Sequence, residues 1–123
     1  MTSRTSPDPA AVLRDRAAQT LAQRDALREA ITAMRTARSL TFADDEHDPE
    51  GSTVSLDQAR DTALLQQSEH TLAEIRAASD RLAAGTYGVC EQCGRAIPEP
   101  RLAARPEARS CVSCAEGPSN RRS

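Results

Sequence analysis

The feature that most constrains this chain is a pair of Cys-x2-Cys motifs, Cys90-Glu-Gln-Cys93 and Cys111-Val-Ser-Cys114, separated by seventeen residues. Two thiolates with two residues between them can face one concavity when the backbone turns sharply, and glycines beside the first pair permit such a turn. Two of these halves complete a tetrahedron of sulfurs around one zinc ion. Because every position is then filled, the spacing predicts a structural zinc site that cannot activate water.

Other uses of paired cysteines fit the sequence less well. Two disulfides would suit an exported protein, but residues 1–9 lack the apolar core of a signal peptide, so we expect a cytoplasmic chain with reduced thiols. A thioredoxin-like dithiol needs a preceding strand, and no segment here is rich in strand-forming residues. A site that releases zinc on oxidation stays open as an alternative, although nothing in the sequence singles it out.

The remainder of the chain is expected to be helical. The 123 residues include one Tyr, one Phe and no Trp, and much of the hydrophobic share is Ala. Such a chain buries too little apolar area for a large core and suits long helices that pack closely. No Gly or Pro interrupts the sequence from Pro9, behind the helix-capping Asp8, to about Leu40. A narrow seam at helical spacing is formed by Leu13, Ala17, Thr20, Leu27, Ile31 and Met34.

A second helix is predicted from a capping box at Ser55 and Gln58 to Ala84, with Gly85 as its C-terminal cap. Its seam follows a seven-residue spacing through Leu65, Leu72 and Ser79 and through Ser68, Ile75 and Leu82. A polar turn joins the two helices, so an antiparallel hairpin of coiled-coil type is expected. An ordinary helical bundle is the alternative, but these seams are too narrow to cover a third and fourth helix.

The predicted fold is therefore mostly α, a long helical hairpin followed by a small four-cysteine zinc finger with one short helix, 100–105. We expect a disordered N-terminus (1–8), the hairpin (9–84), the finger (85–115) and a disordered tail (116–123). The turn at 44–50 carries five acidic residues and no base, although the whole chain has a net charge of only −2. No run of apolar residues is long enough to span a membrane.

No catalytic arrangement is visible. His47 and His70 are separated by most of a helix, and each is interpreted as a surface residue. The sequence has no Ser/His/Asp grouping and no phosphate-binding glycine loop, so an enzyme is not expected.

The C-terminal motifs closely resemble the DksA/TraR family of bacterial zinc-finger regulators. The resemblance rests on Gly85-Thr-Tyr-Gly88, on Ile97-Pro-Glu-Pro-Arg-Leu102 and on Arg105-Pro106 ahead of the second cysteine pair. It implies a cytoplasmic, non-enzymatic regulator that binds bacterial RNA polymerase. In this family a helical hairpin enters the secondary channel and brings an acidic tip near the catalytic centre, often together with the nucleotide ppGpp. Whether ppGpp binds this chain is not decided by the sequence.

The tip pattern of the family, Asp-x-x-Asp-x-Ala, is matched in part. Asp45 and Asp48 have the required spacing, while Glu50 stands where Ala is expected. The resemblance therefore implies Asp45 and Asp48 as polymerase-contacting residues and leaves the regulatory output open. The alternative interpretation is that these acidic residues only keep the turn solvated.

Two other kinds of function are carried forward. A nucleic-acid-binding zinc ribbon would use Arg95, Arg101, Arg105 and Arg109. Residues 90–123 carry a net charge of only +2 and Tyr87 is the one aromatic residue nearby, so direct DNA binding is not expected. The third possibility is an adaptor whose hairpin pairs with another helical protein.

Overall fold

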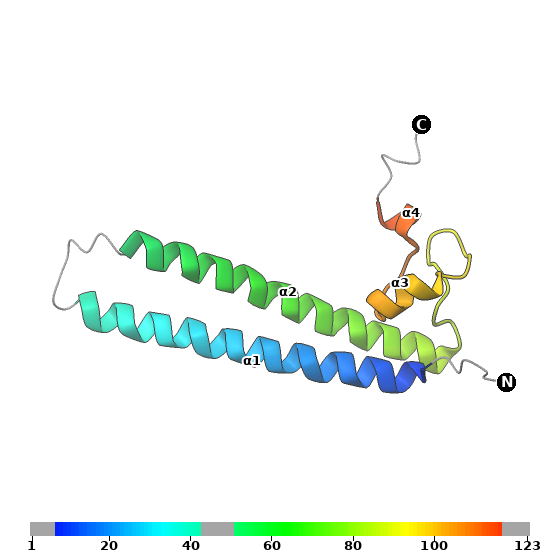
Figure 1. Ribbon diagram of the computed structural model, residues 1–123, viewed down its shortest axis with the longest axis horizontal. Helices are drawn as coiled ribbons and strands as arrows, with labels where there is room; N and C mark the ends of the chain where they lie inside the picture. Colours follow the sequence, from blue (N-terminus) through cyan, green and yellow to red (C-terminus); the bar gives the residue numbers. More distant parts are fainter. Residues whose placement is uncertain (1–6, 43–50, 117–123) are drawn as a thin grey trace. The chain divides into compact units, whose positions relative to one another are not determined.

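The computed structural model describes residues 7–42 and 51–116 (Figure 1). This part contains two long helices, α1 (Pro9–Phe42) and α2 (Gly51–Ala84), and two short ones, α3 (Glu99–Ala104) and α4 (Val112–Ala115). Its only β-type pairing is a single antiparallel bridge between Val89 and Ala96. The prediction of a mostly α fold with a helical hairpin and a four-cysteine region is confirmed. Within residues 7–42 and 51–116, the helices lack the apolar stretch that a membrane span requires.

The outer ends of the long helices follow local sequence signals. Pro9 is the first residue of α1, and the amide of Ala10 donates to Asp8 Oδ1 at 3.4 Å. At the end of α2 the amide of Thr86 donates to Arg81 O at 2.8 Å, and Gly85 donates to Leu82 O at 3.2 Å with a φ of 83°. This pair of bonds is a Schellman motif, and its left-handed residue is the predicted glycine.

The other helix boundaries correct the expectations. α2 begins at Gly51, so the capping box predicted at Ser55 is wrong and Ser55 lies inside the helix. No proline lies between Gly51 and Ser55 to delay the start of the helix, and Gln58 accepts a hydrogen bond from Arg38 Nη1 at 3.1 Å. α3 starts one residue earlier than predicted, and the single turn of α4 was not predicted.

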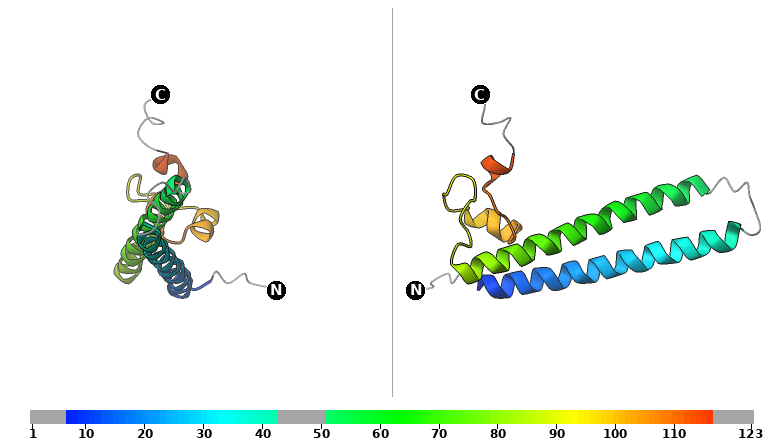
Figure 2. Two further views of the ribbon diagram at one scale, coloured as in Figure 1. Left: turned by 90° about the vertical axis from the view of Figure 1, so that its left-hand side faces the viewer. Right: turned by 180° about the vertical axis from the view of Figure 1, so that it is seen from behind.

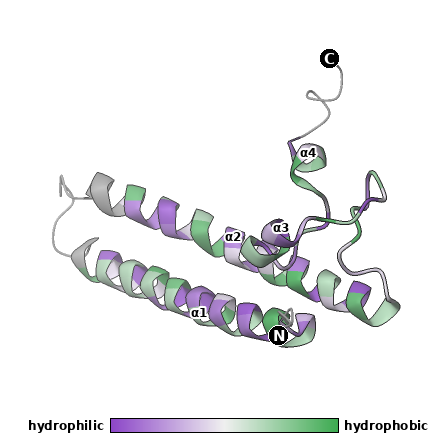
Figure 3. Ribbon diagram, turned by 45° about the vertical axis from the view of Figure 1, so that its right-hand side comes forward, coloured by the Kyte–Doolittle hydropathy of each residue, from purple (hydrophilic) through white to green (hydrophobic). Residues whose placement is uncertain are grey.

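The described chain divides into two compact units. Of the described residues, one unit contains 7–18 and 72–116, and the other contains 19–42 and 51–71. Within each unit a stretch of α1 runs antiparallel beside a stretch of α2 (Figures 1 and 2). Polar and apolar residues are interspersed along both helices, as narrow seams require (Figure 3).

The first unit has a small apolar core at the helix ends. Leu13, Ile75 and Ala78 are buried there, with exposed fractions of 1%, 4% and 0%. The partly buried Ala17, Leu82 and Tyr87 pack against them. This cluster joins the beginning of α1 to the end of α2 and to the linker that follows it.

The second unit has a more polar seam. Ile31 is buried there, but so are the polar side chains of Thr20, Asp61 and Ser68. Ser68 Oγ donates to the carbonyl of Leu64 at 3.1 Å, and Asp61 accepts from Arg60 at 3.2 Å. Arg28 also pairs with Glu69 across the helices at 3.1 Å. Apolar burial therefore contributes little to this part of the hairpin.

Replacing Leu13 by Ala is expected to destabilise the protein by about 2–5 kcal/mol, because it leaves a cavity in the small core of the first unit. Denaturant unfolding followed by circular dichroism checks this value. The matched control is Leu40→Ala on the same helix, where the side chain is 70% exposed, and a change within about 0.5 kcal/mol is expected. Equal effects of the two substitutions would contradict the assignment of the core.

Candidate metal centre

The first cysteine pair lies in a tight loop closed by the bridge between Val89 and Ala96. The amide of Cys90 donates to Arg95 O at 2.8 Å, and the amide of Gly94 donates back to Cys90 O at 2.9 Å. Gly94 has a φ of 75°, a conformation that L side chains rarely adopt. This turn brings the amide of Cys93 within 3.5 Å of Cys90 Sγ, so both thiols face the same side of the loop.

The second pair is arranged by α4. Cys111 is the residue that precedes this helix, and Cys114 lies within it. The amide of Ala115 donates to Cys111 O at 2.9 Å, which closes the turn. Two cysteines three residues apart on one helical turn project to the same side.

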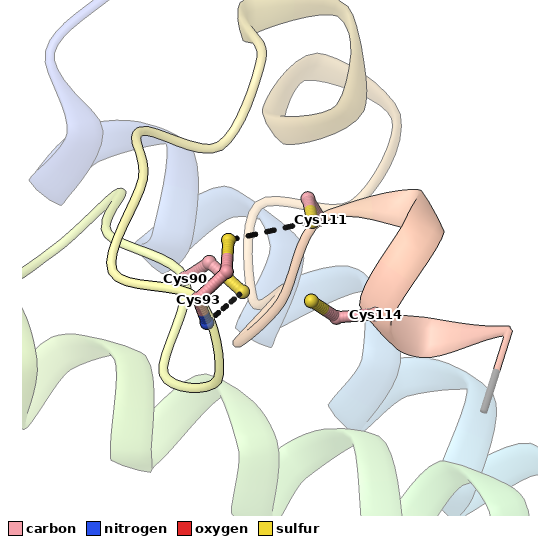
Figure 4. A group of neighbouring side chains, drawn as sticks. All are labelled: Cys90, Cys93, Cys111 and Cys114. Carbon is pink, nitrogen blue, oxygen red and sulfur yellow. Dashed lines mark hydrogen bonds between the residues drawn. The ribbon is translucent and has the colours of Figure 1, made fainter. Parts of the chain in front are cut away.

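The four sulfurs converge on one point (Figure 4). All of them lie within 4.8 Å of one another, and Cys93 Sγ is 3.9 Å from Cys111 Sγ. In a tetrahedral site with zinc–sulfur bonds near 2.3 Å, neighbouring sulfurs are about 3.8 Å apart. The cysteines are free thiols, which argues against the disulfide alternative. The arrangement thus fits one metal ion.

The surroundings of the sulfurs are partly apolar. Cys90, Ile97 and Cys114 form a buried cluster, against which Leu102 and Cys111 pack. Cys93 is exposed. A cluster this small stabilises a fold weakly, so a bound metal is expected to supply much of its folding free energy.

The thiols differ in their tendency to ionise. Hydrogen bonds to its sulfur, first that of the Cys93 amide, lower the pKa of Cys90 to about 6. Sharing of hydrogen bonds with the neighbouring thiols, Cys111 first, raises the pKa of Cys114 to about 12. Without metal the site therefore keeps at least one proton, and a divalent cation must displace it to gain four thiolate ligands.

Ion pairs connect the finger to the long helices within the first unit. Arg16 of α1 holds both carboxylate oxygens of the buried Glu107 at 3.1 Å each. Arg109 holds both oxygens of Glu74 on α2 at 2.5 and 2.7 Å, and its Nη1 lies 3.6 Å from Glu91. The charged partners raise the pKa of both arginines, so these guanidinium groups stay charged. These ion pairs were not predicted from the sequence, because residues 35 and 91 positions apart in the chain leave no local pattern.

Some of the other candidate residues lie within the described part of the chain and some do not. Asp45, Asp48 and His47 lie outside the described residues, and His70 is exposed. Among the arginines of the proposed nucleic-acid ribbon, Arg109 is engaged with carboxylates, and Arg101 Nε donates to Ser110 O at 3.1 Å. Half of that arginine set is thus engaged in contacts within the protein.

Comparisons with known proteins point to one family. Residues 85–119 match the model described as the prokaryotic dksA/traR C4-type zinc finger. Over 46 residues the chain is 56% identical to an uncharacterized protein of Aquifex aeolicus, covering 37% of this chain and 32% of that protein. Over 68 residues it is 37% identical to general stress protein 16O of Bacillus subtilis, covering 55% of this chain and 42% of that protein. The chain thus spans less than half the length of these curated relatives.

A solved structure extends the similarity to the helices. Transcription factor DksA2 from Pseudomonas aeruginosa is 26% identical to this chain, with a TM-score of 0.54, and the match covers 95% of this chain and 93% of that one. The resemblance inferred from the motifs is thereby confirmed. A C4-type finger holds zinc, so the predicted cofactor is also confirmed. The family consists of regulatory zinc-finger proteins and not of enzymes, as expected for this chain.

Zinc binding at this site is expected to weaken as the pH falls. Near neutral pH the Cys114 thiol, with a pKa of about 12, must lose its proton to zinc, whereas Cys90, with a pKa of about 6, is already ionised. Below about pH 6 the proton on Cys90 must be displaced as well, so the logarithm of the affinity falls by about one further unit per pH unit. Competition with a chromophoric chelator across this range measures the slope. An affinity that does not change with pH would contradict ligation by these thiolates.

Proposed function

Because this chain carries the zinc finger of the DksA/TraR family, we propose that it is a transcription regulator that binds bacterial RNA polymerase through the hairpin of α1 and α2. The observation that supports this most is the similarity to transcription factor DksA2, which covers 95% of the chain and so extends beyond the finger to both long helices. A relative that shared only the finger would say nothing of the hairpin.

The dimensions and charge of the hairpin suit such a role. Each long helix has 34 residues, which corresponds to about 50 Å at 1.5 Å per residue. The sequence between them, residues 44–50, holds five acids and no base. An acidic segment between two long helices can approach a magnesium-bearing site inside a large partner and alter it through its field and hydrogen bonds. Duplex DNA would repel the same charge.

Within this proposal the residues have separate roles. Cys90, Cys93, Cys111 and Cys114 hold one structural zinc ion and contribute no chemistry of their own. Asp45 and Asp48 contact the polymerase, since they match the spacing of the tip pattern of the family. Glu50 stands where the family pattern has Ala. The effect of this chain on transcription should therefore differ from that of its relatives in size or direction.

Direct nucleic-acid binding is a weaker candidate. Arg109 and Arg101 are held by Glu74 and by the carbonyl of Ser110. Arg95 and Arg105 are exposed, but two arginines offer few phosphate contacts. Gel shifts with duplex DNA provide the comparison, and binding that weakens steeply with salt would favour this alternative.

The wild-type chain is expected to be retained by immobilised core RNA polymerase and to change transcription from a promoter template. The double substitution Asp45→Asn and Asp48→Asn should weaken the effect on transcription about tenfold or more, because it removes two charges that contact the polymerase. The matched control, Asp15→Asn with Asp80→Asn, removes the same charge from exposed positions near the start of α1 and the end of α2, remote in the sequence from residues 44–50, and should behave like the wild type.

The two parts of the experiment separate two claims. Absence of polymerase binding by the zinc-loaded wild type would overturn the proposed function. Binding by the wild type with equal effects of the tip and control variants would retain the partner and remove the role of Asp45 and Asp48.

A further inference from the structure

The segment 106–110, called here the anchor segment, runs from α3 to the second cysteine pair and ends one residue before Cys111. Each of its five consecutive carbonyls accepts a hydrogen bond from a residue outside it. The bonds are Tyr87 Oη to Pro106 O at 2.8 Å, Arg81 Nη2 to Glu107 O at 3.5 Å and to Ala108 O at 3.3 Å, Glu91 N to Arg109 O at 2.9 Å, and Arg101 Nε to Ser110 O at 3.1 Å.

This pattern matters because the anchor segment is neither helix nor strand. Pro106, Glu107 and Ala108 are buried, so water is a poor substitute for protein donors there. Four of the five bonds come from side chains, and a single guanidinium, that of Arg81, provides two of them. The path of the backbone into Cys111 therefore depends on a few side chains that lie outside the finger loops.

The two residues that donate to the carbonyls of 106–108, Arg81 and Tyr87, lie where the finger follows α2. Arg81 is in the last turn of α2, and its side chain is only 12% exposed. Tyr87 belongs to the linker after this helix and packs against the core of Leu13 and Ile75. Both donors are thus fixed by the helix ends and not by the metal ligands.

Glu91 joins the two halves of the metal site. It directly follows Cys90, and its amide holds the carbonyl of Arg109 at 2.9 Å. Its carboxylate lies 3.6 Å from Arg109 Nη1 and 3.9 Å from Arg81 Nη1. The first cysteine loop and the anchor segment are therefore connected by backbone and side chain at the edge of the zinc site.

We propose that Arg81 and Tyr87 are positioning residues for zinc, because they hold the anchor segment and so favour the conformation in which the second half of the site binds metal. Partners beyond the ligand atoms orient the ligands of metal sites in this way. The coupling is reciprocal, so a bound zinc ion also strengthens the attachment of the anchor segment to the end of α2. This inference does not depend on polymerase binding.

The test measures zinc dissociation constants of the full chain by competition with a chromophoric chelator. Arg81→Ala is expected to weaken zinc binding about 10–100-fold, although Arg81 provides no ligand atom. Tyr87→Phe removes one hydroxyl and should weaken it a few-fold. The control is Arg105→Ala, which removes an exposed arginine of the finger whose side chain makes no hydrogen bond or ion pair within the described residues, and it should leave the constant unchanged.

Circular dichroism of the zinc-loaded variants shows whether each one folds. If Arg81→Ala fails to fold, the zinc dissociation constant of the milder variant Tyr87→Phe is compared with that of Arg105→Ala instead. Equal zinc affinities for Tyr87→Phe and Arg105→Ala would overturn the proposal.

Hydrogen exchange provides a second readout that does not use affinity. Removing zinc from the wild type with a chelator should speed amide exchange in the last turn of α2, 81–84, and in residues 107–110. Amides of α1 between residues 24 and 34 should be unaffected. Unchanged exchange at 81–84 and 107–110 would show that zinc and the helix end are not coupled.

Discussion

The convergence of four thiols on one point is the constraint on which the C-terminal part of this protein depends. Apart from the cysteines, Ile97 and Leu102 are the main apolar residues of the finger cluster. So few apolar contacts cannot offset the chain entropy of about thirty residues. A metal that binds the folded finger and not the unfolded chain supplies the missing free energy, and this explains why a finger with little regular structure can hold one conformation.

A second constraint acts where the finger follows α2. The apolar core of Leu13, Ile75 and Ala78 is small. Ion pairs provide further contacts between the finger and the long helices. Glu107 is buried and is matched by Arg16, while Glu74 is matched by Arg109, so each carboxylate has both oxygens satisfied. Buried carboxylates are tolerated only with such pairing. These ion pairs join the finger to the beginning of α1 and to α2. Loss of zinc is therefore expected to weaken the packing of the helix ends, and disruption of the helix ends is expected to weaken zinc binding.

Local sequence signals predicted the parts of the structure that have local causes. The spacing of the cysteines, Pro9 at a helix start and Gly85 at a helix end each reflect a backbone requirement within a few residues, and the structure contains all three. The capping box at Ser55 was wrong because α2 already begins at Gly51, which places Ser55 inside the helix. The pairing of Arg16 with Glu107 could not be predicted, since only the folded chain brings such distant residues together. The tip residues Asp45 and Asp48 lie outside the described residues, so their role rests on the sequence pattern.

Zinc-edge X-ray absorption on protein purified without added chelators tests the central claim most directly. One zinc ion per chain, with four sulfur neighbours at about 2.3 Å, is the predicted result. A first shell that contains nitrogen or oxygen in place of any sulfur, or protein that carries little zinc and has its cysteines joined as disulfides, would contradict the account.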